Sequence, residues 1–236
     1  MSYKKIINKI TNRFGLSVTR HIKGPIDSIP FDTIFDIGAN TGQYAKSVFD
    51  SGYSGKIISF EPIIAAHKEL KKNASMNAKW FVHDRCAIGE AYKEDIEINI
   101  SKNSVSSSIL PIMNSHISSA PESLFVGKEK TKLFTLDSVF NEYCSDENGN
   151  FLKIDTQGYE HNVLEGAKNS LTSINAVEIE LSTIKLYEDT KLYNYYFNFF
   201  DDMGFTLWSV DQVFFPSQKD NRILQFDAIF VKKSLL

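Results

Sequence analysis

Strand-length apolar runs alternate with helix-length amphipathic segments along most of this 236-residue chain. The clearest unit is a short strand at Thr33–Asp36, a glycine-rich turn, and a helix from about Gln43 to Asp50. A second unit has an isoleucine-rich strand at Lys56–Phe60 and a helix at Ile63–Ala74, which follows Pro62 as many helices follow a proline. Because strands that alternate with helices usually pair in parallel, this order predicts a parallel sheet with helices on both faces.

The remaining elements continue this alternation and add an antiparallel edge. Strands are expected at Lys79–His83, Glu94–Ile100, Phe151–Ile154, Ala176–Leu181, Thr206–Val210 and Phe226–Lys232, and helices at Leu136–Tyr143, Asn162–Lys168 and Leu192–Met203. The last two strands lie close together in the chain, which predicts an antiparallel pair. Ser/Asn-rich residues from Ser101 to about Pro121 predict a long loop, often a lid or binding loop. We therefore expect a doubly wound, Rossmann-like α/β domain whose mostly parallel sheet has one antiparallel edge strand.

The N-terminal segment differs in charge from the rest of the chain. Residues 1–26 hold six Lys and Arg residues and no acidic residue, and Tyr3–Phe14 has apolar residues at helical spacing opposite the cations. Such a basic amphipathic helix docks on an anionic membrane surface or an acidic partner, or it packs on the domain's own sheet. We expect residues 1–30 to form an appendage and residues 31–236 to form the main domain.

Overall charge and cysteine content exclude several classes of protein. A formal net charge of -3 gives no case for nucleic-acid binding, which usually needs a basic surface. The two cysteines, Cys86 and Cys144, form neither a disulfide framework nor a zinc spacing, so a reducing, cytoplasmic location is expected. No run of 18 apolar residues and no signal peptide is present.

Chemistry is expected where the first strand ends, because ligands of doubly wound sheets bind beyond the carboxyl ends of the strands. There the chain reads Asp36-Ile37-Gly38-Ala39-Asn40-Thr41-Gly42. Gly38 and Gly42 allow a tight turn and close approach of a ligand, and the turn lacks the G-x-G-x-x-G pattern of dinucleotide sites. The Asp36 carboxylate would repel a pyrophosphate and attract a cation. With Asn40, this turn predicts a site for a cationic cofactor that carries an amino acid.

Two further strand ends complete the predicted cofactor site. Glu61 ends the second strand, 25 positions after Asp36, where a carboxylate can accept both hydroxyls of a ribose. Plain capping of the next helix would also explain Glu61, and the pairing with Asp36 favours the ribose. Asp84 follows the third strand, where an adenine amine would lie, although polarity of a surface turn explains Asp84 equally well.

Three motifs together resemble the FkbM-type methyltransferase family. They are Phe35–Tyr44, Phe60-Glu61-Pro62, and Leu152–Glu160 with Val163–Ala167. The resemblance implies a seven-stranded class I methyltransferase fold and methyl transfer from S-adenosylmethionine, usually to a hydroxyl of a glycan sugar or a secondary metabolite. Residues 31–236 would then be the methyltransferase domain. Gln157 departs from the family, since many members carry Glu there, which weakens a mechanism that needs a carboxylate at that position.

The fourth strand supplies the candidate catalytic group. Methylation of a hydroxyl needs its proton removed as the oxygen attacks, and Asp155 at the tip of this strand is the first candidate for general base. Glu160 and Glu180 are the next candidates for the general base. Asp155 would also serve as the N-cap of the next helix, and the two roles stay open here. No Asp/Asn cluster follows the strand, so no metal is predicted.

Three hypotheses for function follow. The first is an S-adenosylmethionine-dependent O-methyltransferase that modifies a glycan or small-molecule hydroxyl and does not act on nucleic acid. The second is an NAD-dependent oxidoreductase, which Asp36 and the absent third glycine disfavour. The third is a methyltransferase fold that binds cofactor without turnover, since fold alone does not establish catalysis. The acceptor and the oligomeric state cannot be read from the sequence.

Overall fold

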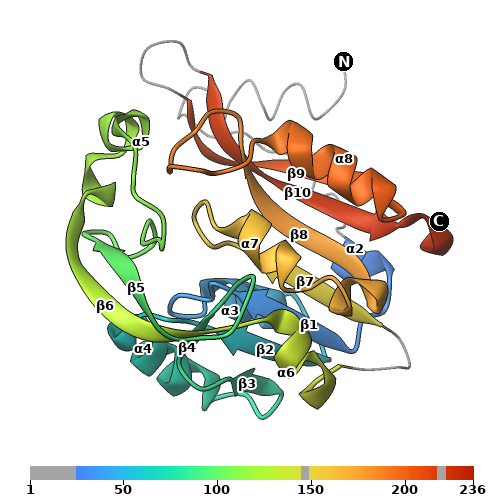
Figure 1. Cartoon of the computed structure of the whole chain (residues 1–236). Helices are drawn as coiled ribbons and strands as arrows, with labels where there is room; N and C mark the ends of the chain where they lie inside the picture. The colour runs from blue at the N-terminus through green and yellow to red at the C-terminus, as the bar shows by residue number, and fades with distance from the viewer. Residues whose placement is uncertain (1–24, 145–148, 217–221) are drawn as a thin grey trace, which may run out of the picture.

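A seven-stranded sheet forms the centre of the computed structural model, which describes residues 25–144, 149–216 and 222–236 (Figure 1). The N-terminal helix expected at Tyr3–Phe14 lies outside the described residues. The sheet contains β1 (Thr33–Ile37), β2 (Lys56–Phe60), β3 (Trp80–Val82), β7 (Asn150–Ile154), β8 (Ile174–Ser182), β9 (Phe205–Pro216) and β10 (Ile223–Lys232). Their order is β3-β2-β1-β7-β8-β10-β9.

Strand directions confirm the predicted sheet. Neighbouring strands from β3 to β8 are parallel, whereas β10 pairs antiparallel with both β8 and β9. The strand order reverses at β1, which pairs with β2 on one side and with β7 on the other. This reversal is the switch point at which doubly wound sheets bind ligands. The sheet is seven-stranded and mostly parallel, with antiparallel pairing at one edge.

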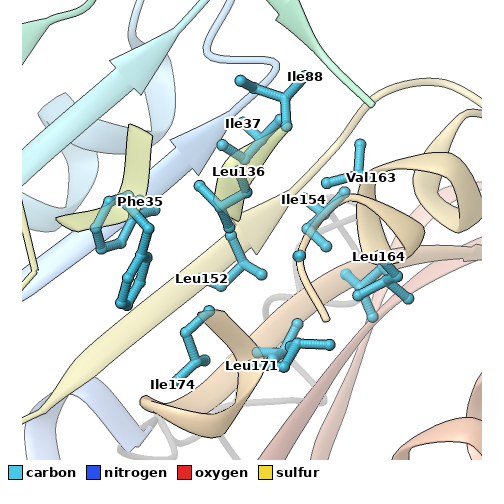
Figure 2. Packing of buried hydrophobic residues seen from close by; sticks show 14 of the residues in the cluster. Phe35, Ile37, Ile88, Leu136, Leu152, Ile154, Val163, Leu164, Leu171 and Ile174 are labelled. Carbon is cyan, nitrogen blue, oxygen red and sulfur yellow. The ribbon is translucent and has the colours of Figure 1, made fainter. Parts of the chain in front are cut away.

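Helices cover both faces of the sheet, as expected. The helices on one face are α2 (Pro25–Ser28), α3 (Gln43–Asp50) and α4 (Ile64–Ala74), and those on the other are α6 (Leu136–Val139), α7 (Glu160–Glu165) and α8 (Tyr193–Asp202). Side chains alternate along β1, so Ile34 packs in the cluster that contains α3 and α4, while Phe35 and Ile37 pack with Leu136 and Val163 (Figure 2). This alternation builds two cores from one strand.

A second, three-stranded sheet curves away from the main one and was not predicted (Figure 1). It contains β4 (Cys86–Ile88), β6 (Phe125–Phe134) and β5 (Lys93–Ser101) in that order. Of these, only β5 was expected, at Glu94–Ile100. The alternation of Lys and Glu hides β6 from a search for apolar periodicity. Cross-strand ion pairs replace apolar contacts there, with Lys128 bonded to Glu97 and other lysines paired likewise.

The expected loop from Ser101 to about Pro121 contains short helices. These are α5 (Asn114–Ser119) and a 3-10 turn at Pro121–Ser123. The helix expected at Leu136–Tyr143 is divided into α6 and a 3-10 turn at Phe140–Glu142, and further 3-10 turns lie at Ser170–Thr172 and Lys233–Leu235. In the described part of the chain, no helix has both the length and the apolarity that crossing a membrane requires.

Candidate active site

A cavity opens at the switch point, between the carboxyl ends of β1, β2 and β7 and the loop that follows β5. Strand ends and their turns supply one wall, and residues 104–109 supply part of the other. Its lining includes Asp36, Gly38, Asn40, Tyr44, Glu61, Ala87, Ile98, Ser104, Val105, Ser107, Ile109, Lys153, Asp155 and Gln157. The structure therefore brings most of the predicted site residues to one place.

Left-handed backbone makes the turn after β1 possible. Gly38 and Gly42 have φ of 83° and 91°, and Asn40 has φ of 48°. A Cβ on Gly38 would overlap the backbone carbonyl of Asp155, and one on Gly42 would overlap the Trp80 ring. The glycines thus permit close packing against the protein itself, whereas the sequence predicted close approach of a ligand. Contacts within the protein therefore hold the turn against the tip of β7.

Asp36 lies at the floor of the cavity, near the end of β1. Asp36 is 2% exposed, and its carboxylate accepts a hydrogen bond from Ser59 Oγ at 3.0 Å. Burial raises the pKa of Asp36 from 3.8 to about 6, against the opposing influence of Lys153 and of the Ser59 hydrogen bond. A buried carboxylate that gains its charge near neutral pH would be stabilised by a cationic ligand.

Glu61 bonds to the start of α4 and to the β1 turn, and it also lines the cavity. Its carboxylate accepts the backbone N–H of Ile63, which starts α4, and the backbone N–H of Asn40 in the β1 turn, both at 2.8 Å. Glu61 is 3% exposed within the cavity lining. Burial raises the pKa of Glu61 to about 7, although both N–H groups oppose this. Each oxygen keeps acceptor capacity toward a ligand.

Asp84 does not lie with the other predicted residues. Its side chain is 98% exposed, its nearest ion-pair partner is Lys71 Nζ at 3.8 Å, and it is absent from the cavity lining. The Asp84 side chain faces solvent, whereas the residues of β4, which begins two residues later, line the cavity. Apolar side chains such as Ala87 and Ile98 line that end of the cavity instead. A flat apolar ring fits between them better than a charged group.

Asp155 lines the cavity directly after β7. Its carboxylate is hydrogen-bonded by Gln157 Nε2 at 2.8 Å and lies 3.4 Å from Lys153 Nζ. The alternative role as an N-cap is wrong, because α7 begins at Glu160 and its N-cap is Tyr159. The Asp155 side chain is 38% exposed, so it is accessible from the cavity.

Glu160 and Glu180 lie outside the lining of the cavity. Glu160 Oε1 accepts the backbone N–H groups of Thr156 and Gly158, at 3.1 and 3.0 Å, and so holds the loop between β7 and α7. Glu180, on β8, lies behind Gln157, which donates to it at 2.8 Å. Burial raises the pKa of Glu160 to about 7 and that of Glu180 well above its usual value. Both carboxylates face protein donors.

Lys153, Tyr44 and Glu178 were not predicted as site residues. Lys153 is 5% exposed and lines the cavity, and its ammonium lies 5.6 Å from the centre of the Tyr44 ring. The Tyr44 hydroxyl donates to Glu178 at 3.0 Å. Burial lowers the pKa of Lys153, but the carboxylates of Asp155 and Glu178 raise it more, so Lys153 keeps its charge. A lysine inside the buried strand Asn150–Ile154 was the signal that could have found this cluster.

His116 and His161 lie away from the cavity lining. His116 is 1% exposed and packs edge-on against the Tyr187 ring, and burial lowers its pKa to about 4. His161 lies on α7 against the Tyr195 ring. The described residues contain no group of three or more His, Cys, Asp or Glu side chains arranged to hold a metal ion.

Comparison with known proteins gives a family. A family model described as the methyltransferase FkbM domain matches residues 36–207, well over half of the chain. A search of curated proteins finds no match. Among solved structures, the chain is similar to a methyltransferase FkbM from Methylobacillus flagellatus KT, at 13% identity and a TM-score of 0.50, covering 85% of this chain and 43% of that chain. The chain thus spans less than half of that protein, and the likeness shows the fold alone.

Fibrillarin from Aeropyrum pernix, with natively bound S-adenosyl-L-methionine, is another similar structure, at 12% identity and a TM-score of 0.49 over 96% of this chain and 74% of that chain. We infer nothing about this chain from that score. The family model, by contrast, begins at Asp36 and takes in Glu61 and Asp155, so it includes both edges of the cavity. With S-adenosylmethionine as its expected cofactor, the chain belongs to the FkbM methyltransferase family.

Proposed function

We propose that this methyltransferase is an O-methyltransferase that acts on a hydroxyl of a glycan sugar or of a secondary metabolite. The observation that carries this proposal is the Asp155 carboxylate, accessible in the cavity and held by both Lys153 and Gln157. A hydroxyl is a weak nucleophile until its proton is taken, and a fixed carboxylate within hydrogen-bond reach performs that step. Glycan modification and a cytoplasmic location belong to the same proposal.

The cavity offers the groups that S-adenosylmethionine needs. Asp36 would hold the cationic amino-acid end, Glu61 would accept the ribose hydroxyls, and the turn containing Gly38, Asn40 and Gly42 would lie along the cofactor. The donor set fits, because two buried carboxylates on adjacent strands suit a ligand that combines a cation with a diol. Asp84, expected at the adenine, contributes nothing to this arrangement, and apolar side chains take that place.

Bound S-adenosylmethionine supplies a methyl group on a positively charged sulfur. Asp155 would accept the proton of the acceptor hydroxyl and so make its oxygen nucleophilic toward that methyl group. Lys153 stays protonated and holds Asp155 from one side, and Gln157 holds it from the other. Most of the remaining acceleration comes from holding the oxygen in line with the methyl group, which ordered residues on strand ends do well. Glu160 and Glu180 remain reserves for the base, at some distance from the cavity lining.

Mass spectrometry tests this proposal. The protein is incubated with S-adenosylmethionine and a panel of nucleotide sugars, surface glycans and small polyols, with RNA included as a contrasting class. We expect a gain of one methyl on a hydroxyl-bearing acceptor, together with S-adenosylhomocysteine. Binding of S-adenosylmethionine by calorimetry without S-adenosylhomocysteine from any acceptor would favour the non-catalytic hypothesis, and methylated RNA would overturn the acceptor class. The family assignment leaves no observation in favour of an NAD-dependent oxidoreductase.

A further inference from the structure

Gln157 has an unfavourable backbone conformation at the tip of β7. Its φ is 57°, and Gly158, the next residue, has φ of 97°. A left-handed conformation is unfavourable for a residue other than glycine, so the surrounding contacts must hold it in place. Ser108 Oγ donates to the Gln157 carbonyl at 2.7 Å, and Gly158 packs against the Tyr187 side chain with no room for a Cβ. Such strain is a common feature of functional sites.

The Gln157 side chain is fully engaged with its neighbours. Its Nε2 donates to Asp155 Oδ1 and to Glu180 Oε2, each at 2.8 Å. Its Oε1 accepts a hydrogen bond from the Tyr187 hydroxyl at 3.0 Å, and Tyr187 is fully buried. An amide has two N–H donors, and both are used on carboxylates. The tyrosine therefore fixes which way the amide points.

This amide joins a carboxylate in the cavity to one outside it. Asp155 lines the cavity, whereas Glu180 is 8% exposed and receives a second hydrogen bond from Gln225 Nε2 at 2.7 Å. Two carboxylates that close together repel each other unless a donor lies between them. Among the hydrogen bonds of the described residues, Gln157 is the one donor that reaches both. Removal of the amide would release Asp155 from its orientation.

The same residue is tied to the loop over the cofactor cavity. Ser104, Val105, Ser107 and Ile109 line that cavity, and the residues between them bond to the Gln157 region. Ser108 bonds to the Gln157 carbonyl, and the Tyr187 hydroxyl is within 3.0 Å of both the Ser106 carbonyl and the Gln157 amide. Movement of the loop therefore pulls on Gln157, and through it on Asp155.

We propose that Gln157 is a positioning residue that holds Asp155 toward the acceptor hydroxyl and links its orientation to closure of the 104–109 loop over the cofactor. The inference rests on the proposed O-methyltransferase function for the role of Asp155. The contacts among Asp155, Gln157 and Glu180 do not depend on it. The two parts can therefore be tested separately.

Gln225 provides a matched control, because it donates to Glu180 and, among the described residues, makes no hydrogen bond to Asp155. The first measurement needs no acceptor: the carboxyl ¹³C resonances of Asp155 and Glu180 are compared in wild type, Gln157→Leu and Gln225→Leu. We expect the Glu180 resonance to move in both variants and the Asp155 resonance to move in Gln157→Leu alone. An unmoved Asp155 resonance in Gln157→Leu would overturn the proposal whatever the acceptor is.

Hydrogen exchange tests the link to the loop. With S-adenosylmethionine bound, exchange of the peptide covering residues 101–110 should slow in wild type, and slow less in Gln157→Leu and Tyr187→Phe. Gln225→Leu should behave as wild type does. Equal protection of the loop in all four proteins would remove the loop from the proposal. This measurement also needs no acceptor.

Kinetics test the role in turnover once an acceptor is known. Gln157→Leu should lower kcat on the order of tenfold to a hundredfold, with little change in the KM for S-adenosylmethionine. Gln157→Glu keeps the shape but places a third carboxylate beside Asp155, so the acid limb of the kcat profile should move to higher pH. Wild-type kcat and pH profile in both variants would overturn the positioning role. A wild-type protein that methylates no acceptor defeats the proposed function, while the resonance test still decides the contacts.

Discussion

Glu61 and Asp155, which line opposite edges of the cavity, are held by different kinds of hydrogen-bond donor. At the ends of β1 and β2, Glu61 is held by backbone N–H groups of Asn40 and Ile63. At the ends of β7 and β8, Asp155 and Glu180 are held by the side chains of Lys153, Gln157 and Gln225. Backbone donors are present in every sequence that adopts the turn, whereas side-chain donors need particular residues.

We propose that the edge with Glu61 binds the cofactor and is generic, and that the edge with Asp155 binds the acceptor and is specific. The first can stay the same while the acceptor changes, because it depends on turn geometry. The second can change with single substitutions and so adapt to different acceptors. Four experiments test whether the two edges are separable in this way.

The largest expected effect belongs to the acceptor edge. Asp155→Asn removes the proposed base, so kcat should fall about 1,000-fold, within the range for general base catalysis. The dissociation constant for S-adenosylmethionine should change less than about twofold, measured by calorimetry. Asp84→Asn is the matched control, since Asp84 also follows a strand of the same sheet, β3, but lies exposed outside the cavity. Loss of cofactor affinity rather than turnover would show that the edges are not separate.

A substitution between the edges should reduce stability. The added Cβ of Gly38→Ala would overlap the Asp155 carbonyl, where backbone and not a flexible side chain must move. We expect the free energy of unfolding to fall by about 3 kcal/mol or more, counting both overlap and strain. Gly52→Ala is the control, because Gly52 has φ of 101° but open space around it, so only about 1 kcal/mol should be lost. Equal losses in denaturant titrations would contradict the contact.

The cofactor edge is tested by Asp36→Asn. Removal of the buried charge should weaken S-adenosylmethionine binding about 100-fold, or about 2.7 kcal/mol, while circular dichroism shows an intact fold. Ser59→Ala keeps the carboxylate and removes only its hydrogen bond, so less than a tenfold loss is expected. An affinity unchanged in Asp36→Asn would mean that the cation is held elsewhere.

The smallest expected effect is a pH dependence of cofactor affinity. Burial raises the pKa of Asp36 to about 6 and that of Glu61 to about 7, and a cation prefers the ionised forms. Affinity should therefore be full above pH 7 and decline as the pH falls through 7 to 6, with about a tenfold loss by pH 5. Calorimetry across this range measures it. A flat profile in wild type, or an equally steep one in Asp36→Asn, would exclude Asp36 as the titrating group.

Without cofactor, the stability of the fold changes with pH in the opposite direction to cofactor affinity. A folded-state pKa above the unfolded value means that the contribution of Asp36 to stability is full below about pH 4 and is lost as the pH rises through 6. Glu61 follows the same rule up to about pH 7. Without a ligand, ionisation of the Asp36 and Glu61 carboxyl groups therefore lowers the stability of the fold at neutral pH. A bound cation would offset this loss.

Local patterns in the sequence predicted the main sheet and the cofactor edge. The run from Thr33 to Asp50 contains a strand, its turn and its helix, and each of these has a local signature in the sequence. The same holds for Glu61, whose capping partner Ile63 is two residues away. Sequence periodicity reports contacts of this kind well.

Long-range contacts explain what the sequence did not predict. Strand β6 is charged on its exposed face, and its ion pairs with β5 join residues about thirty positions apart. Asp84 was assigned to the cavity because it follows the third strand, but its side chain is exposed and β4, which begins two residues later, was not predicted. Gln157 and Lys153 gain their roles from Glu180 and Glu178 on the adjacent strand, and no spacing along one strand shows which neighbour it will have.

The place of β10 between β8 and β9 affects how the chain matures during synthesis. Strand β9 leaves the ribosome before β10, the strand to which it must pair, so it has no partner in the sheet until residues 223–232 follow. Gln225, the second donor to Glu180, arrives with that late strand. The β1 and β2 turns, by contrast, are complete more than a hundred residues earlier. Strand β10 therefore completes the sheet and the hydrogen bonds of Glu180 after the turns that follow β1 and β2 have been synthesised.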